Sequence, residues 1–182
     1  MKKIAVVFAL ALFVSANSIA QEIKWVTFEE ALALQKKKPK KIMMDVYTNW
    51  CGPCKMLDKN TFHNPDVVKY VNENYYAVKF NAEGNDVVKY KDKTYSNPNY
   101  KAELASRRNS VHDLTRVLKV NAYPTIVFFD EKGETIFPVR GYQNPQQLEL
   151  YLKMFKDDKH KDMKKQEDFN AYYSAFVPAF KG

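Results

Sequence analysis

The most constraining feature of the sequence is a pair of cysteines that directly follows the pattern of a buried strand. Cys51 and Cys54 lie in the run from Trp50 to Lys55, WCGPCK. The preceding run from Ile42 to Tyr47 is apolar and aromatic, as expected of a buried strand, and the residues between turn the chain into a helix. The sequence therefore predicts two thiols at a helix N-terminus, where backbone N–H groups are unpaired.

The number and spacing of the cysteines limit their chemistry. They are the only two in the chain, and a bridge between residues three apart closes almost no loop, so it adds little as a structural cross-link. A zinc site needs about four ligands, whereas the histidines are scattered along the chain. Haem attachment requires a histidine where Lys55 stands. Redox chemistry remains, and we expect no metal and no cofactor beyond a redox-active Cys51–Cys54 disulfide.

The two thiols are expected to have different roles. A thiolate at Cys51 faces the unpaired N–H groups and the positive end of the helix dipole, which favours nucleophilic attack. Cys54 lies one turn inside the helix, where we expect it to be less exposed and to resolve the mixed disulfide. Gly52 permits the tight turn, and Pro53 stiffens it.

The N-terminus has the pattern of an export signal. Two lysines precede an apolar run from Ile4 to Val14, and small residues follow as far as Ala20. We predict a signal peptide over residues 1–20 and a mature, secreted domain over residues 21–182. An uncleaved anchor is the alternative, but polar residues interrupt the apolar stretch short of the roughly 20 residues that a spanning helix needs. We therefore expect a periplasmic protein without stable membrane insertion, in a compartment where thiols tend to oxidise.

The overall charge carries little functional information. The formal net charge is +8, and much of the excess lies in lysine-rich runs over residues 36–41 and 153–165, typical of solvated helix faces. No base-reading motif is present, so we expect no nucleic-acid partner. Hydrophobic residues make up 46% of the chain, enough for one domain with a core, which we expect to be a monomer.

The remaining patterns place the cysteines in an α/β domain. Thr27 and Glu30 form a capping box before a helix that ends at Lys37. The later elements are expected to be a helix over 65–73, a strand over 75–81, a helix over 113–120, strands over 125–129 and 135–139, and a helix over 145–155. Strand–helix–strand order predicts parallel pairing, and the short turn between the last two strands predicts a hairpin.

A carboxylate in the first strand is the second informative feature. Asp45 lies on the strand face opposite Met44 and Val46, so it either faces water or is buried with a raised pKa. If it is buried, it takes or gives the proton as Cys54 cycles. Lys79, in the neighbouring strand, either tunes Asp45 or is an ordinary exposed lysine.

Together these features resemble the thioredoxin family over about Phe28 to Phe155. Asp45 stands six residues before Cys51, as the family's buried aspartate does, and the run from Trp50 to Lys55 matches its active-site motif. The resemblance implies a thioredoxin fold, a central mixed sheet flanked by helices, with a cis-proline loop at Pro124. It also implies a substrate groove formed by Trp50, Gly52, Pro53, Tyr123, Pro124 and Gly141. An extended substrate segment would pair with the backbone at Tyr123 while its disulfide meets Cys51.

Two segments fall outside this frame. An insertion over about residues 84–112 begins after the second strand, at the same end of the sheet as Cys51. It either forms one wall of the substrate groove or merely covers the surface of the domain. A C-terminal extension over about residues 156–182 contains aromatic residues at helical spacing, so we expect an extra helix packed on the domain. A partner-binding aromatic stripe is the alternative.

The resemblance extends to secreted bacterial thioredoxin-like proteins and to the C-terminal domain of the transmembrane reductase DsbD. It implies an oxidoreductase that acts on protein thiols and disulfides in cell redox homeostasis. We expect a disulfide reductase or electron carrier that is re-reduced by a membrane dithiol donor. A disulfide isomerase or oxidant is the alternative, because Tyr123 replaces the aliphatic residue typical of cytosolic thioredoxins. A redox-inert binding module is a third hypothesis.

Overall fold

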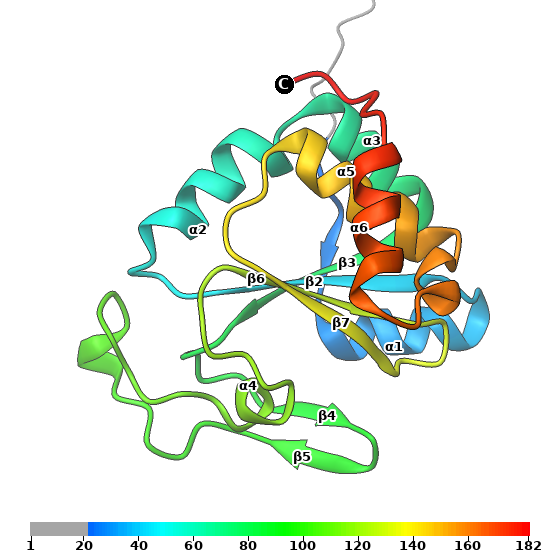
Figure 1. Ribbon diagram of the computed structural model, residues 1–182. Helices are drawn as coiled ribbons and strands as arrows, with labels where there is room; N and C mark the ends of the chain where they lie inside the picture. Colours follow the sequence, from blue (N-terminus) through cyan, green and yellow to red (C-terminus); the bar gives the residue numbers. More distant parts are fainter. Residues whose placement is uncertain (1–21) are drawn as a thin grey trace, which may run out of the picture.

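A five-stranded mixed sheet forms the centre of the domain (Figure 1). The computed structural model describes residues 22–182, so the predicted signal peptide over residues 1–20 lies outside the described residues. The strand order is β1–β3–β2–β6–β7. The strands are β1 (Trp25–Val26), β2 (Lys41–Tyr47), β3 (Tyr75–Asn81), β6 (Thr125–Phe129) and β7 (Thr135–Arg140). As predicted, β2 and β3 are parallel, and β6 and β7 form an antiparallel hairpin.

Helices cover both faces of this sheet. In Figure 1, α1 and α4 lie on one side of the sheet, and α2, α3, α5 and α6 lie on the other. The helices are α1 (Phe28–Lys37), α2 (Gly52–Leu57), α3 (Pro65–Asn74), α4 (Asp113–Val117), α5 (Pro145–Lys156) and α6 (Gln166–Ala175). Met44 of β2 packs in the core cluster on the α1 side, and Met43 packs in the cluster beneath α3 and α5. Both faces of β2 are therefore buried, as expected of a central strand between two helical layers.

Side-chain caps fix where the helices begin. Thr27 and Glu30 form the predicted capping box at α1. Asn64 accepts from two backbone N–H groups at the start of α3, and Asn144 forms a second capping box at α5. A proline at the beginning of α3 and of α5 supplies a fixed φ where no N–H is needed.

The helix predicted over residues 113–120 is shorter than expected. It ends at Val117, because Lys119 adopts a left-handed conformation with φ of 56°. The N–H groups of Lys119 and Val120 then bond back to the carbonyls of Arg116 and Thr115, in the pattern of a Schellman motif. This end was not predicted because a lysine occupies the position where glycine is usual.

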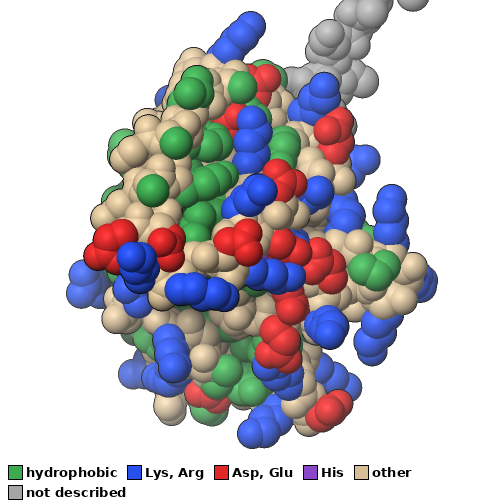
Figure 2. All heavy atoms as spheres, turned by 45° about the vertical axis from the view of Figure 1, so that its right-hand side comes forward, with side chains coloured by type: hydrophobic (Ala, Val, Ile, Leu, Met, Phe, Trp, Pro, Cys, Tyr) green, Lys and Arg blue, Asp and Glu red, His purple; other side chains and the backbone are tan. Residues whose placement is uncertain are grey.

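The lysine run over residues 36–41 was predicted to be solvated, and this is wrong at its last position. Lys41 is the first residue of β2, and only 2% of its side chain is exposed. Its Nζ lies 2.6 Å from Glu131 and 2.9 Å from Asp158, so two carboxylates compensate the buried charge. Figure 2 shows basic and acidic side chains intermixed over the side of the molecule that carries α5 and α6.

The insertion is a folded part of the domain. It contains a hairpin of β4 (Val88–Tyr90) and β5 (Lys93–Tyr95), followed by a 3-10 turn over Ala102–Leu104. Val88 and Tyr90 pack in the same core cluster as α1, and the Tyr90 hydroxyl donates to the carbonyl of Gly133. The hairpin thus extends the α1 side of the core.

The C-terminal extension forms the predicted extra helix, and the residues after it continue along α3 and α5. Phe169 of α6 stacks on Tyr151 of α5 with ring centroids 6.3 Å apart. Farther along, the fully buried Glu149 accepts from the backbone N–H groups of Ala179 and Phe180, each at 2.8 Å, and pairs with Lys153. Within residues 22–182, no helix combines the length and hydropathy needed to cross a membrane.

Removing residues 178–182 is expected to lower the free energy of unfolding by roughly 1–3 kcal/mol, because the Glu149 carboxylate loses its backbone donors. Chemical denaturation of both forms measures the change. Val177→Ala is the matched control, because that side chain is 83% exposed and its loss should leave the midpoint unchanged. An unchanged midpoint in the truncated form would show that the tail contacts do not stabilise the domain.

Candidate active site

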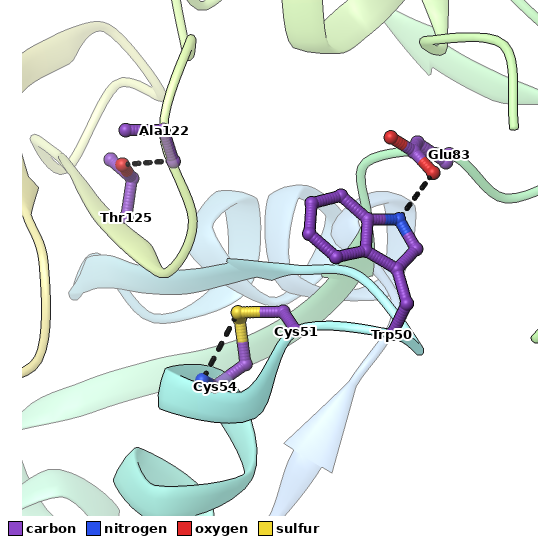
Figure 3. The surroundings of a disulfide bond; sticks show 6 residues. All are labelled: Trp50, Cys51, Cys54, Glu83, Ala122 and Thr125. Carbon is purple, nitrogen blue, oxygen red and sulfur yellow. Dashed lines mark hydrogen bonds between the residues drawn. A yellow bond between two sulfur atoms is a disulfide. The ribbon is translucent and has the colours of Figure 1, made fainter. Parts of the chain in front are cut away.

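The cysteine pair lies where the sequence predicted it, at the N-terminus of α2 (Figure 3). Cys51 caps the helix, and its Sγ accepts a hydrogen bond from the N–H of Cys54 at 3.1 Å. The two residues form a disulfide with their Cα atoms 5.3 Å apart. A sulfur that already receives a backbone N–H is well placed to carry negative charge when the disulfide opens.

The exposure of the two cysteines differs from the prediction. Cys51 is 2% exposed and Cys54 is 6% exposed, so Cys54 is not the less exposed residue. Two neighbouring features account for this. The loop between Ala122 and Thr125 descends towards the disulfide in Figure 3, and Cys54 lines a polar pocket. The disulfide is therefore covered in part by this loop, and Cys54 also borders a polar space.

The loop before β6 brings the predicted groove residues together. The Tyr123–Pro124 peptide bond is cis. The carbonyl of Pro124 accepts from the N–H of Gly141 at 2.8 Å, and Gly141 has φ of 84°, which favours glycine. The ring of Tyr123 meets that of Trp50 edge-on, with centroids 6.1 Å apart. These contacts thus connect three distant segments, the Trp50 turn, the Tyr123–Pro124 loop and Gly141.

Asp45 is buried rather than facing water, with 2% of its surface exposed. Its face of β2 is the one covered by α2, α3, α5 and α6, and the alternation in the sequence could not show which face the helices cover. Burial raises the pKa of Asp45 to about 7 and is the largest influence. The positive charge of Lys79 acts in the opposite direction, and the negative charge of Asp58 adds to the rise. Its Oδ1 has no hydrogen-bond partner among the described residues. A buried carboxyl with a pKa near neutrality is suited to proton transfer.

Lys79 stands directly beside Asp45 in the paired strands. Its ammonium group forms an ion pair with Asp58 and lies 5.7 Å from the centre of the Tyr47 ring. Lys79 therefore pairs with the Asp58 carboxylate, and its positive charge also acts on the pKa of Asp45.

A polar pocket of about 210 Å³ connects these groups with the cysteine pair. It is lined by Asp45, Tyr47, Thr48, Asn49, Cys54, Lys55, Asp58 and Lys79. Asp45 and Cys54 therefore line the same polar space. The sequence associated Asp45 with the cysteine pair only through the spacing of the motif, and the pocket places Asp45 and Cys54 on one shared space.

The insertion forms one side of this site. The indole N–H of Trp50 donates to the Glu83 carboxylate at 2.8 Å (Figure 3), and the same carboxylate oxygen accepts from the N–H of Asn109 at 2.8 Å. The side chain of Asn49 donates to the carbonyl of Ala105 at 2.8 Å. The guanidinium of Arg108 lies over the Trp50 ring, 4.8 Å from its centroid. The insertion therefore contacts the turn that carries Cys51 and does not merely cover a remote surface.

Sequence reasoning missed these insertion contacts. Glu83 lies two residues after the end of β3, at the end of the sheet where sites on parallel strands lie, and its position was an available signal. Arg108 and Asn109 carry no such signal, because their contacts with the active-site turn depend on how a long loop folds back.

Comparisons with known proteins agree with this geometry. A family described as "Thioredoxin-like domain" matches residues 28–156. The "Thiol:disulfide interchange protein DsbD" of Pectobacterium atrosepticum is 28% identical over 121 residues, which are 65% of this chain and 17% of that protein. The protein of the same name from Cronobacter sakazakii is 34% identical over 108 residues, 59% of this chain and 14% of that protein. The chain thus matches only a small part of these much longer relatives.

Among solved structures, a thioredoxin-fold protein from Helicobacter pylori superposes with a TM-score of 0.57 at 22% identity, covering 75% of this chain and 81% of that one. At 22% sequence identity, this similarity shows a shared fold only.

Proposed function

The chain belongs to the thioredoxin-like domain family, and from this premise we propose that it is a periplasmic disulfide reductase or electron carrier. Its family and its Cys51–Cys54 disulfide make it a thiol-disulfide oxidoreductase. The observation that carries the proposal is the cysteine pair at the start of α2, with Asp45 on the same polar pocket as Cys54.

The proposed reaction transfers two electrons from the reduced pair to a client disulfide. The Cys51 thiolate attacks one client sulfur, which forms a Cys51–client disulfide and releases the other client sulfur as a thiolate that takes up a proton. The Cys54 thiolate then attacks the Cys51 sulfur. This second step releases the remaining client thiolate and closes the Cys51–Cys54 disulfide, the state that the structure contains.

Asp45 is proposed to accept the proton of Cys54 before the second step. Its carboxyl borders the same pocket as the Cys54 sulfur, and burial keeps its pKa near neutrality. An acid–base group is most effective when its pKa lies near the working pH. Lys79 tunes this group, because its positive charge favours the ionised carboxylate.

The client segment is proposed to lie along the loop at Tyr123 and Pro124. The pairing of β6 with its neighbours begins at Thr125, so the backbone just before it lies outside the sheet ladder. An extended segment can pair with such backbone while its disulfide reaches Cys51. Trp50, Gly52, Pro53 and Gly141 are proposed to line the same site, which the Trp50–Tyr123 and Gly141–Pro124 contacts support.

The compartment and the electron donor are also part of the proposal. The lysines and apolar run before Ala20 support export to the periplasm. The similarity to proteins named for thiol:disulfide interchange supports a dithiol partner, and we propose a membrane protein in this role.

The reductive direction is tested by the reduction potential of the Cys51–Cys54 couple. We expect a value close to about −270 mV, as in reducing thioredoxins. The mature protein is equilibrated in graded glutathione buffers, and free thiols are counted by alkylation and mass spectrometry. A potential near about −120 mV would contradict the reductase proposal and favour a disulfide oxidant, because each 30 mV corresponds to about 1.4 kcal/mol.

A further inference from the structure

The insertion places a positively charged side chain beside the reactive pair. The guanidinium of Arg108 lies 4.8 Å from the centroid of the Trp50 ring, and Arg108 is exposed to solvent. Trp50 directly precedes Cys51 in the chain. A guanidinium held face-on to an aromatic ring keeps the N–H groups along its edge available to a further acceptor.

The Glu83 carboxylate, which bonds the same indole that Arg108 covers, is already engaged with other groups. Glu83 is 8% exposed, and its carboxylate accepts from Trp50 and Asn109. Arg108 forms no ion pair with any other residue in the range 22–182. Its charge therefore faces the site without a partner from this part of the chain.

The loop that carries Arg108 is held at both ends. On one side, the carbonyl of Ala105 accepts from the Asn49 side chain at 2.8 Å. On the other side, the N–H of Asn109 donates to Glu83, and the Asn109 side chain bonds the backbone N–H and carbonyl of Lys101 at 3.0 and 2.7 Å. Arg108 is thus positioned before any substrate arrives, which reduces the entropy that binding must overcome.

We propose that Arg108 is a specificity residue that binds a carboxylate close to the reactive disulfide of a protein client. The inference rests on the proposed function, because it concerns the substrate of the same site. A planar guanidinium pairs with a carboxylate through two parallel N–H···O bonds. The preferred clients are therefore proteins with an aspartate or glutamate beside the cysteine that Cys51 attacks.

The test compares two disulfide-bonded peptides that differ only in a pair of residues next to the cysteines, aspartate in one and asparagine in the other. The protein is first reduced with dithiothreitol and freed of it, and the rate of its oxidation by each peptide is followed in a single turnover. We expect the unmodified protein to react about tenfold faster with the acidic peptide at low ionic strength, and the preference to shrink as salt is added.

Variants of Arg108 separate this preference from the chemistry. Arg108→Ala is expected to react with both peptides at nearly the same rate, and Arg108→Glu to favour the neutral peptide. Arg107→Ala is the matched control, because Arg107 is the exposed neighbour in the same loop and should leave the preference in place. A preference that survives in Arg108→Glu overturns the proposal.

Two further outcomes show whether the role of Arg108 or the proposed reductase function is wrong. If the unmodified protein reduces both peptides at equal rates, the role of Arg108 is wrong and the proposed reductase function stands. If it reduces neither peptide, the proposed function itself fails. A third arm uses oxidised glutathione. If Arg108→Ala slows only this small substrate, the residue recognises the carboxylates of a low-molecular-weight disulfide and the protein-client proposal is overturned.

Discussion

Cys51→Ser is expected to abolish disulfide reduction, with a loss of roughly a thousandfold or more, because a serine hydroxyl is not ionised near neutral pH and cannot form the mixed disulfide. Cys54→Ser is expected to attack clients normally and then stop, because no thiolate remains to displace the client from Cys51. The first variant should therefore show no covalent intermediate, and the second should accumulate one.

The two outcomes are distinguished by incubating each reduced variant with an oxidised client, quenching with acid and measuring the mass of the products. Met56→Ala is the control on the same helix, because its side chain is 52% exposed and lies outside the proposed machinery. Equal residual activity in both cysteine variants, or a mixed disulfide in Cys51→Ser, would contradict the assigned order of attack.

Asp45→Asn is expected to change how stability depends on pH. Burial raises the pKa of Asp45 from 3.8 to about 7, so the folded protein holds a proton that the unfolded chain releases. The stability due to this proton is fully present below about pH 4 and is lost progressively as the pH rises to about 7, by about 4 kcal/mol in all. Asparagine does not titrate. The oxidised variant should therefore gain stability relative to the unmodified protein over this range, as measured by urea unfolding at several pH values.

The same substitution is expected to slow the closing step about 10- to 100-fold, because the proton of Cys54 loses its acceptor. The pH profile of this step should also lose its inflection near pH 7. Asp58→Asn is an informative comparison, since Asp58 raises the pKa of Asp45 and its removal should move the inflection to lower pH. An Asp45→Asn variant that keeps the inflection would assign the titration to another group.

The central strands could be predicted because their apolar runs are bounded by strong local signals. The strands over Tyr75–Asn81 and Thr125–Phe129 begin and end where predicted, and both are followed by polar or turn residues. The β4–β5 hairpin was missed because each of its strands has only three residues and contains an exposed lysine, so the alternation is too short to recognise.

Within the site, residues that belong to local sequence motifs could be predicted, whereas contacts between distant segments were missed. The cysteine pair, Asp45 and Pro124 could be identified because each belongs to a short recognisable pattern. The contact between Trp50 and Glu83 joins residues 33 positions apart, and only the place of Glu83 just after β3 pointed to it. Whether Asp45 faced water also depended on which helices cover its side of the sheet, and this is decided by the whole fold.

The environment of Trp50 has a consequence for spectroscopy. The chain has two tryptophans, and only Trp50 stands next to the disulfide, with Arg108, Glu83 and Tyr123 around its indole. Trp25 packs instead against Phe62, in the core cluster beneath α3 and α5. A Trp25→Phe protein therefore carries a single tryptophan. When it is excited selectively over the tyrosines, its emission should report on the opening of the disulfide and the arrival of a client, without any attached label.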